Sequence, residues 1–216
     1  MIALHKLSEP LAKLGVLFDW QQRWFSGNYR DMHAQFARYT AHGQHVLDLG
    51  CGAGGCAHRI WEGANSRYVG ADLSRSYLQM NRARHPDASV VLADLGKLPF
   101  RWLDFDAICL FSILHHLDDS TLGALGSFLA KHVAAKTRIL IAEPVFPPSK
   151  SCASDRVSHF LLSHDRGRHI RPSRDYVRLL GEGLETVRAF EFKYSLHHFC
   201  GFELRRRGDG SSGGKL

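Results

Sequence analysis

The sequence contains few cysteines, and none of them form a C-x-x-C pair. The cysteines are Cys51, Cys56, Cys109, Cys152 and Cys200. Their odd number does not suggest a disulfide framework, and without closely spaced pairs a zinc knuckle is not indicated. We therefore expect reduced cysteines with mostly structural roles.

Long apolar runs are also missing. Within the first 25 residues, MIALHKLSEPLAKLGVLFDWQQRWF, every apolar run is interrupted by Lys, Glu, Asp or Pro. This pattern fits neither a signal peptide nor a membrane-spanning helix. The sequence therefore predicts a cytoplasmic protein without a membrane span.

Acidic residues are fewer than basic ones, 21 against 28, which gives a formal net charge of +7. A basic protein favours acidic partners, although Arg205, Arg206 and Arg207 near the C-terminus carry part of this charge. No recognisable RNA-binding appendage accompanies the basic residues. We therefore do not expect nucleic acid as a partner, and the sequence does not determine the oligomeric state.

The length of 216 residues, 44% of them hydrophobic, suits one sizeable core. We expect a single domain over residues 1–207, with a helical lid at 1–43 and an α/β core at 44–207. Residues 208–216, GDGSSGGKL, are rich in glycine and polar, and predict a disordered tail.

Short apolar runs alternate with helix-length segments along the core. This pattern is typical of a mostly parallel sheet that is covered by helices on both faces. The expected strands lie at about 45–49, 67–71, 89–93, 105–111 and 138–142, with a late pair near 185–194 and 199–206.

A glycine-rich turn, VLDLGCGAGG at residues 46–55, follows the first expected strand. Gly50, Gly52 and Gly55 fit the G-x-G-x-x-G turn of dinucleotide sites, whereas Gly50, Gly52 and Gly54 fit the G-x-G-x-G turn used for S-adenosylmethionine. Asp48 separates the two readings, because a carboxylate there would repel a pyrophosphate. The ammonium and sulfonium cations of S-adenosylmethionine would be attracted instead, or the carboxylate would brace the turn around them. The sequence therefore favours the sulfonium ligand.

Two further acids follow the next two expected strands. Asp72 ends RYVGAD, where a carboxylate can accept hydrogen bonds from both ribose hydroxyls of a nucleoside. Asp94, in VVLADLGKLPF, could accept the adenine amino group, with the Leu95 N–H nearby for a ring nitrogen. The third acid favours methyl transfer over a nucleotide-dependent oxidoreductase.

With these motifs the sequence resembles the class I S-adenosylmethionine-dependent methyltransferases, and it looks most like the small stand-alone members that modify metabolites such as quinones and natural products. The likeness runs through VLDLGCGAGG, VGADLS, ADLGKLPF, FDAICLFSILHHLDD and RILIAEP, about half of the chain. The resemblance implies a Rossmann-like, doubly wound α/β fold with a seven-stranded, mostly parallel sheet whose last strand is antiparallel. The implied site for S-adenosyl-L-methionine consists of Asp48, Gly50, Cys51, Gly52, Gly54, Asp72, Leu73, Asp94, Leu95, Phe111 and Ser112.

Motifs that this sequence lacks reduce the number of possible classes of methyl acceptor. Enzymes that methylate DNA adenine or protein glutamine carry an Asn/Asp-Pro-Pro-aromatic run where this sequence has FSILHH, and cytosine C5 methylation needs a Pro-Cys pair that is missing here. We therefore expect a small-molecule acceptor that attacks through oxygen or, less readily, nitrogen. An RNA methyltransferase and a cofactor-binding accessory subunit without turnover remain the alternatives.

His115 and His116 follow the fourth expected strand, at the edge where open α/β sheets bind ligands. Either one is a candidate general base, because an unperturbed histidine pKa suits proton transfer at neutral pH. The alternative is a structural pair that caps the strand. HHLDD also suggests metal ligands, but Asp119-Ser120 fits a helix N-cap before TLGALGSFLAKHV, so no metal is expected.

The N-terminal region contains an apolar stripe at helical spacing. Its members are Phe25, Tyr29, Met32 and Phe36, and Trp20 and Trp24 precede it. The stripe is either core or a wall of an apolar acceptor pocket. In the second case Trp20, Trp24 and Tyr29 are the candidate substrate-binding residues.

The long segment after the fifth expected strand contains Arg166, Arg168 and Arg171. These arginines could hold an anionic acceptor, but arginines in loops are more often solvated. Ser173 is expected to start the helix that follows, RDYVRLLGEG.

Overall fold

The computed structural model describes residues 30–208 except 62–63, 96–104, 166 and 195. The elements in chain order are α2 (Arg30–Phe36), η3 (Ala37–Tyr39), β1 (His45–Leu49), α3 (Ala57–Trp61), β2 (Arg67–Asp72), α4 (Arg75–Arg84), β3 (Ser89–Leu92), β4 (Ala107–Phe111), η5 (Leu114–His116), α5 (Asp119–His132), β5 (Arg138–Val145), α6 (Ala153–Ser163), α7 (Ser173–Leu180), β6 (Leu184–Tyr194) and β7 (His197–Arg206). Among the residues described, no helix is both long and apolar enough to cross a membrane.

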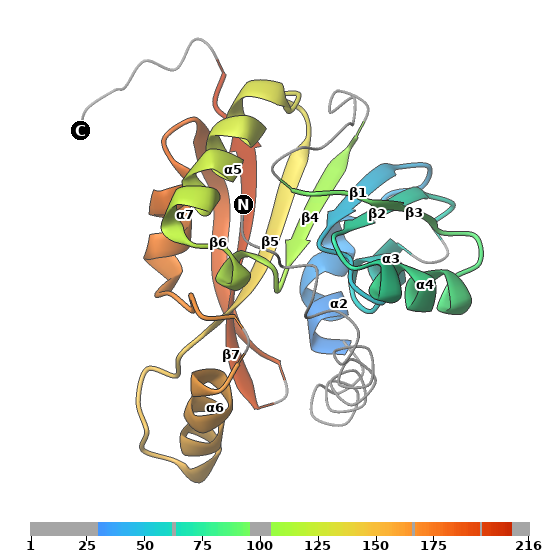
Figure 1. The fold of residues 1–216 in the computed structure, drawn as a ribbon. Coiled ribbons are helices and arrows are strands. Elements are labelled where there is room, and N and C mark those ends of the chain that lie inside the picture. The colour runs from blue at the N-terminus through green and yellow to red at the C-terminus, as the bar shows by residue number, and fades with distance from the viewer. Residues whose placement is uncertain (1–29, 62–63, 96–104, 166, 195, 209–216) are drawn as a thin grey trace, which may run out of the picture.

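The strands form one seven-stranded sheet in the order β3-β2-β1-β4-β5-β7-β6 (Figure 1). The first five strands pair in parallel, and β7 runs antiparallel to both β5 and β6. The predicted α/β fold with an antiparallel last strand is therefore confirmed. Strand bounds differ slightly from expectation: β3 ends at Leu92, β4 begins at Ala107, and β5 continues to Val145.

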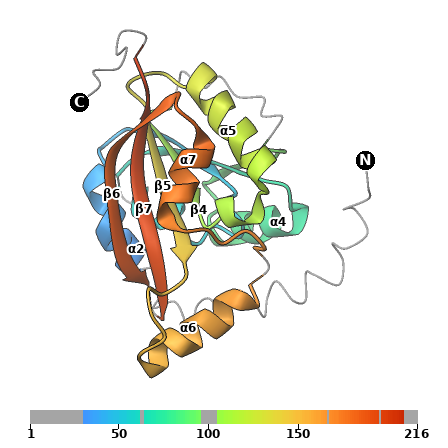
Figure 2. The ribbon, with the colours of Figure 1, turned by 90° about the vertical axis from the view of Figure 1, so that its left-hand side faces the viewer.

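Successive side chains of the central strands point to opposite faces of the sheet and pack in two cores, one on each face. On β1, Leu47 and Leu49 belong to the core that includes Leu122 and Leu129 of α5. Val46 belongs to the opposite core, with Phe36 of α2. Figure 2 shows α5 and α7 on one side of the strands and α2 on the other. Burial on both faces explains why the strand sequences are nearly continuous apolar runs.

The strand order changes direction in the middle of the sheet, between β1 and β4. β2 and β3 extend it from β1 on one side, while β4 and β5 extend it on the other. The carboxyl ends of β1 and β4 therefore lie side by side at a switch point, where open α/β sheets bind ligands.

The predicted N-cap of α5 is wrong by one residue. Asp118, in an extended conformation, is the N-cap, and its Oδ1 accepts the Thr121 N–H at 2.7 Å. Asp119 is the first helical residue and its carboxylate instead accepts hydrogen bonds from Arg171. Ser173 begins α7 as expected, directly after its N-cap Pro172, but the helix ends at Leu180, three residues before the end of the expected segment RDYVRLLGEG.

Helices α5 and α7 approach each other closely at one glycine. A Cβ atom added to Gly126 would lie 1.9 Å from the Leu180 carbonyl oxygen, a backbone atom that cannot rotate away. A Cβ on Gly123, one turn earlier in α5, would lie 3.5 Å from the Leu179 carbonyl oxygen, an ordinary contact. A substitution at Gly123 therefore serves as a control for the same substitution at Gly126 in the same helix.

We expect Gly126→Ala to lower the free energy of unfolding by about 1–3 kcal/mol, because the helices must separate. Gly123→Ala should leave the free energy of unfolding unchanged or raise it by up to about 1 kcal/mol, through better helix propensity. Urea unfolding followed by circular dichroism measures both. Equal effects of the two substitutions would contradict the close approach.

Candidate functional site

The glycine loop after β1 turns at three positions with left-handed backbone. Gly50, Gly52 and Gly54 have φ angles of +78°, +50° and +78°, which side-chain-bearing residues rarely adopt. The loop is anchored to β2, because the Gly50 and Cys51 N–H groups both donate to the Ala71 carbonyl oxygen, at 2.8 and 3.1 Å. The predicted turn is therefore present at the carboxyl end of β1.

The space around these glycines differs. A Cβ on Gly50 would lie 2.6 Å from Ile113, and one on Gly54 would lie 2.6 Å from Asn81. Among the residues that the structure describes, and apart from its two neighbours in the chain, a Cβ on Gly52 would meet no atom within 4 Å. The backbone at Gly52 is therefore open to close approach by a ligand.

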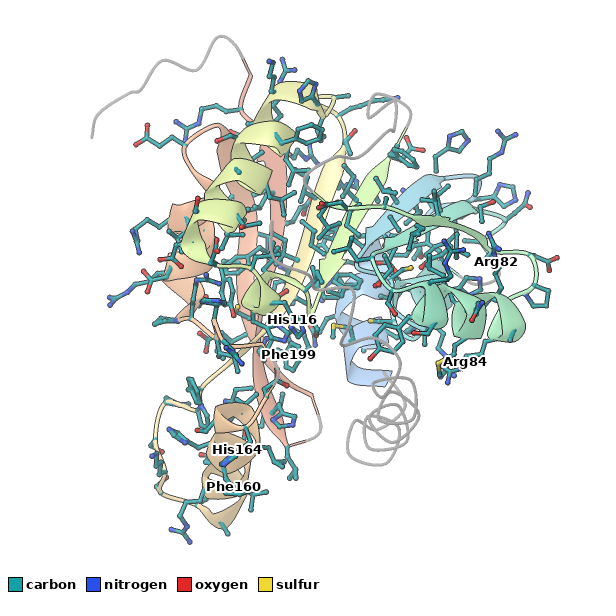
Figure 3. The ribbon with its side chains drawn as sticks, viewed as in Figure 1. Arg82, Arg84, His116, Phe160, His164 and Phe199 are labelled. Carbon is teal, nitrogen blue, oxygen red and sulfur yellow. The ribbon has the colours of Figure 1, made fainter. Side chains whose placement is uncertain are left out.

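Side chains of α4 and its C-cap hold the outer part of the loop. They contact three consecutive carbonyl groups, and Figure 3 labels Arg84 on this helix. The pairs are Asn81 Nδ2 with the Gly52 oxygen at 3.4 Å, Arg84 with the Ala53 oxygen at 3.2 Å and His85 Nε2 with the Gly54 oxygen at 2.8 Å. These contacts fix the loop on the side that faces α4.

Asp72, the last residue of β2, supports the loop directly. Its Oδ2 accepts the Gly52 N–H at 2.9 Å, and its Oδ1 accepts the Ser74 N–H at 2.7 Å. Burial raises the pKa of Asp72, although these two N–H groups oppose the shift. Each carboxylate oxygen retains a lone pair, so binding of ribose by Asp72 is compatible with the geometry and stays a prediction.

Asp48 lies beneath the loop rather than at its open surface. The residue is only 4% exposed, and the Tyr68 hydroxyl donates to its Oδ2 at 2.6 Å. Burial raises the pKa of Asp48 to about 7, although the Tyr68 hydrogen bond lowers it and the charge of Asp72 adds to the rise. The sequence left two roles open for Asp48, bracing the turn and attracting the cationic ligand. A buried position beneath the loop suits bracing, and attraction from there acts through charge over a distance and not by direct contact.

The remaining predicted cofactor residues lie along the same edge. Leu73 is 67% exposed just after β2, and Asp94 is exposed just after β3 with Leu95 half-buried beside it. Phe111 is buried, with its ring centroid 4.7 Å from that of Phe36, and its place beside the methyl group stays a prediction.

Ser112 follows Phe111 and is exposed at the end of β4. Its φ angle is +55°, a strained value for a residue with a side chain. Its N–H donates to the Ala142 carbonyl oxygen of β5 at 2.8 Å, which holds the turn in place. Backbone strain of this kind is found preferentially at functional sites.

Glu143, a buried residue of β5, organises the turn after β4. Its Oε1 accepts the N–H groups of Ile113 and Leu114, both at 2.8 Å, and its Oε2 accepts that of His115 at 3.2 Å. The same Oε2 lies 2.6 Å from His115 Nδ1. Sequence reasoning missed Glu143. The only available signal was an acid at the end of an apolar strand, in RILIAEP.

His115 is buried, and its other ring nitrogen, Nε2, lies 3.5 Å from Asp165 Oδ1. Burial alone would lower the pKa of His115, but the carboxylates of Glu143 and Asp165 raise it to about 9. A proton acceptor at neutral pH needs a neutral imidazole. The surroundings of His115 therefore disfavour the predicted role as general base, whereas the side chain of His116, labelled near the centre of Figure 3, is exposed.

Arg171 corrects the expectation of solvated loop arginines. It is buried, and its guanidinium donates two hydrogen bonds to Asp119 Oδ1, at 2.6 and 3.0 Å. It also donates to three backbone carbonyl oxygens, those of Leu114, Leu117 and His169. Arg171 therefore fastens the segment before α7 to the turn after β4. Arg168 is exposed as expected, and Arg166 lies outside the described residues.

Only half of the predicted N-terminal stripe falls within the described residues. Met32 and Phe36 are buried in the core on the α2 side of the sheet, so these two positions follow the core alternative. Trp20, Trp24, Phe25 and Tyr29 lie outside the described residues, and their role as acceptor contacts stays a prediction.

Comparison with known proteins gives matches among methyltransferases. Residues 46–135 match a family described as a methyltransferase domain. The chain is 30% identical over 118 residues to cycloartenol-C-24-methyltransferase of Arabidopsis thaliana, covering 49% of this chain and 35% of that protein. It is 35% identical over 79 residues to a probable 18S rRNA (guanine-N(7))-methyltransferase of Dictyostelium discoideum, covering 36% of this chain and 27% of that protein. The matches thus span about a third or less of these relatives.

Among solved structures, the fold is similar to that of N-methyltransferase NodS from Bradyrhizobium japonicum WM9 in complex with S-adenosyl-L-homocysteine. The TM-score is 0.63 at 17% identity, over 83% of this chain and 87% of that one. At this level of identity the likeness concerns the fold.

The open space at Gly52 leads to a binding prediction. Gly52→Ala should weaken binding of S-adenosylhomocysteine by at least about tenfold, since the new methyl group enters the space left for the ligand. Gly43→Ala is the matched control, because Gly43 has a φ of +75°, is also open around its Cβ position, and precedes the opposite end of β1. Both variants should lose a similar stability, about 1–2 kcal/mol. Titration calorimetry that gives both variants the same affinity would place the ligand elsewhere.

Asp48 leads to a pH prediction. Its pKa of about 7 in the folded chain exceeds the ordinary value of 3.8, so the folded state binds the proton more tightly than the unfolded state. The free energy of unfolding should therefore fall as pH rises from about 4 to 7. Asp48→Asn should remove this dependence and be more stable than wild type above pH 7, yet bind S-adenosylmethionine more weakly.

Urea unfolding between pH 4 and 8, compared for the two proteins, measures the stability difference, and calorimetry measures the affinity. A stability difference between them that stays constant across this pH range would show that Asp48 is not the titrating group.

Proposed function

Since the chain contains a class I S-adenosylmethionine-dependent methyltransferase domain, we propose that it transfers the methyl group of S-adenosylmethionine to a small organic molecule. The observation that carries the proposal is the open backbone at Gly52, whose N–H is held by Asp72 and beneath which Asp48 is buried. A loop of this kind at the switch point between β1 and β4 suits a cationic nucleoside.

Our proposal puts the parts of the cofactor along the edge of the sheet. The methionine end lies over Gly52, the ribose hydroxyls bind Asp72, and the adenine lies between the exposed Leu73 side chain and Leu95. The sulfonium methyl then points toward Ser112 at the end of β4. Leu73 supports the adenine position, because a large exposed apolar side chain at this edge is otherwise costly to leave in water.

The chemistry that we propose is in-line attack of the acceptor on the sulfonium methyl group. The leaving thioether is neutral and needs no general acid, so the protein has to orient the two reactants and exclude water. We favour an oxygen acceptor over nitrogen. The acceptor loses its proton beside His116, because Glu143 is hydrogen-bonded to His115 Nδ1 and the surroundings of His115 favour a protonated ring.

The segment between β5 and β6, which we place on the acceptor side, favours a small-molecule acceptor over RNA. Between β5 and β6 the described residues contain only two short helices, α6 and α7, and α7 packs on the core through Tyr176 and Leu180. No additional nucleic-acid-binding unit is present among these residues. The acceptors named for the two relatives, cycloartenol and a guanine of 18S rRNA, represent the small-molecule and RNA classes that an experiment has to separate.

Transfer of a labelled methyl group distinguishes these classes. The full chain is incubated with S-adenosylmethionine carrying a 13C and tritium-labelled methyl group and with an extract separated into small-molecule, RNA and protein fractions. We expect label in the small-molecule fraction, with a 13C chemical shift typical of a methyl group on oxygen, and at least about tenfold less label with Gly52→Ala.

Label found mainly in RNA or protein would overturn the proposed acceptor class. Binding of S-adenosylhomocysteine without label in any fraction would instead favour an accessory subunit.

A further inference from the structure

We infer that His115, His116 and Asp165 form a binding site for one divalent zinc ion at the acceptor edge of the sheet. The three side chains bring their ligand atoms to within 4.8 Å of one another. No metal was expected from HHLDD, because Asp119-Ser120 fits a helix N-cap; in the structure Asp118 is the N-cap and Asp119 pairs with Arg171. Asp165 lies 50 residues further along the chain than His115, so no local pattern joins it to the histidine pair.

The orientation of His115 follows from Glu143. Three backbone N–H groups already donate to the Glu143 carboxylate, which keeps it an acceptor. The Nδ1 atom of His115, 2.6 Å away, therefore donates its hydrogen, and Nε2 points toward Asp165, so that zinc would replace the proton that Nε2 carries in the protonated ring. A histidine whose other ring N–H is held by a carboxylate is the usual arrangement at protein metal sites.

The spacing of the ligand atoms, which form an ion pair when His115 is protonated, also suits a bound ion. His115 Nε2 and Asp165 Oδ1 are 3.5 Å apart, beyond the usual 2.7–3.2 Å of an N–H···O bond. In tetrahedral zinc sites, bonds of about 2.0–2.2 Å place neighbouring ligand atoms about 3.4 Å apart. An ion between the two atoms therefore fits with little movement.

The loop that carries Asp165 is built against the His115 ring. The Gly167 N–H donates to Asp165 Oδ1 at 2.6 Å, and a Cβ on Gly167 would lie 1.8 Å from His115 Cδ2. The His169 N–H also donates to the His115 carbonyl oxygen at 3.0 Å. These contacts fix the carboxylate opposite the imidazole, as a preorganised site requires.

The third ligand and the overall charge also suit zinc. The His116 ring centroid lies 4.3 Å from that of His115, and its side chain is exposed. Two imidazoles and one carboxylate favour zinc over magnesium or calcium, which prefer oxygen ligands. An ion of charge +2 balances the carboxylates of Glu143 and Asp165. Three protein ligands leave a fourth position open, as in catalytic zinc sites.

Binding of the ion does not depend on the proposed function, but its role in the reaction does. An acceptor hydroxyl bound at the open position would lose its proton to solvent near neutral pH, because the ion lowers the hydroxyl pKa. The resulting oxygen anion would attack the sulfonium methyl, so that the O–CH3 bond forms as the S–CH3 bond breaks and neutral S-adenosylhomocysteine leaves. In this reaction His116 acts as a ligand.

Titration of the tag-free, metal-stripped full chain tests the site. Calorimetry with ZnCl2 should give one ion per chain, and CoCl2 should produce the intense visible absorption of tetrahedral cobalt. His116→Ala and Asp165→Asn should each weaken binding at least about tenfold and reduce the cobalt absorption. His132→Ala, which removes an exposed histidine at the end of α5, is the control and should bind zinc like wild type.

No stoichiometric binding, or equal binding by His116→Ala and His132→Ala, would overturn the site. Titration of the same variants with S-adenosylhomocysteine separates this result from the proposed function, because the metal-site variants should keep wild-type cofactor affinity. Methyl transfer that persists without zinc would support the proposed function while refuting the role of the ion in it.

Discussion

At the carboxyl end of β1 the backbone has to turn so that a ligand can approach it closely, and the rest of the candidate site depends on this constraint. Three left-handed glycines let the loop turn there, and Asp72 holds the Gly52 N–H from the neighbouring strand. Helix α4 in turn holds the loop carbonyl groups. Because hydrogen bonds tie the loop to β2 and α4, we expect the loop itself to lose little conformational entropy on binding.

A single buried glutamate plays the corresponding part on the acceptor side. Glu143 joins β5 to the turn after β4 through three backbone N–H groups and the His115 ring. A buried carboxylate is tolerable only when such donors surround it. Arg171 then fastens the following segment to the same turn. The histidine pair, whether it binds an ion or contacts the acceptor directly, is held by this arrangement.

The sequence predicts what depends on local pattern. Strands buried on both faces appear as continuous apolar runs, and the glycine turn with Asp72 has a fixed spacing, so the fold and the loop could be anticipated. The positions of Glu143, Asp165 and Arg171 depend on contacts between segments far apart in the chain, which no local pattern reports. The N-cap of α5 was misassigned to Asp119 because Asp118 and Asp119 are both good capping residues, and only pairing with Arg171 distinguishes them.

The central claim is that a sulfonium nucleoside binds across the carboxyl ends of β1, β2 and β4. A crystal structure of the chain with S-adenosylhomocysteine tests it most directly. We predict ribose hydroxyls within hydrogen-bonding distance of the Asp72 carboxylate, the homocysteine backbone over Gly52, and the sulfur directed toward Ser112. A ligand bound elsewhere, or one whose ribose makes no contact with Asp72, would contradict the claim.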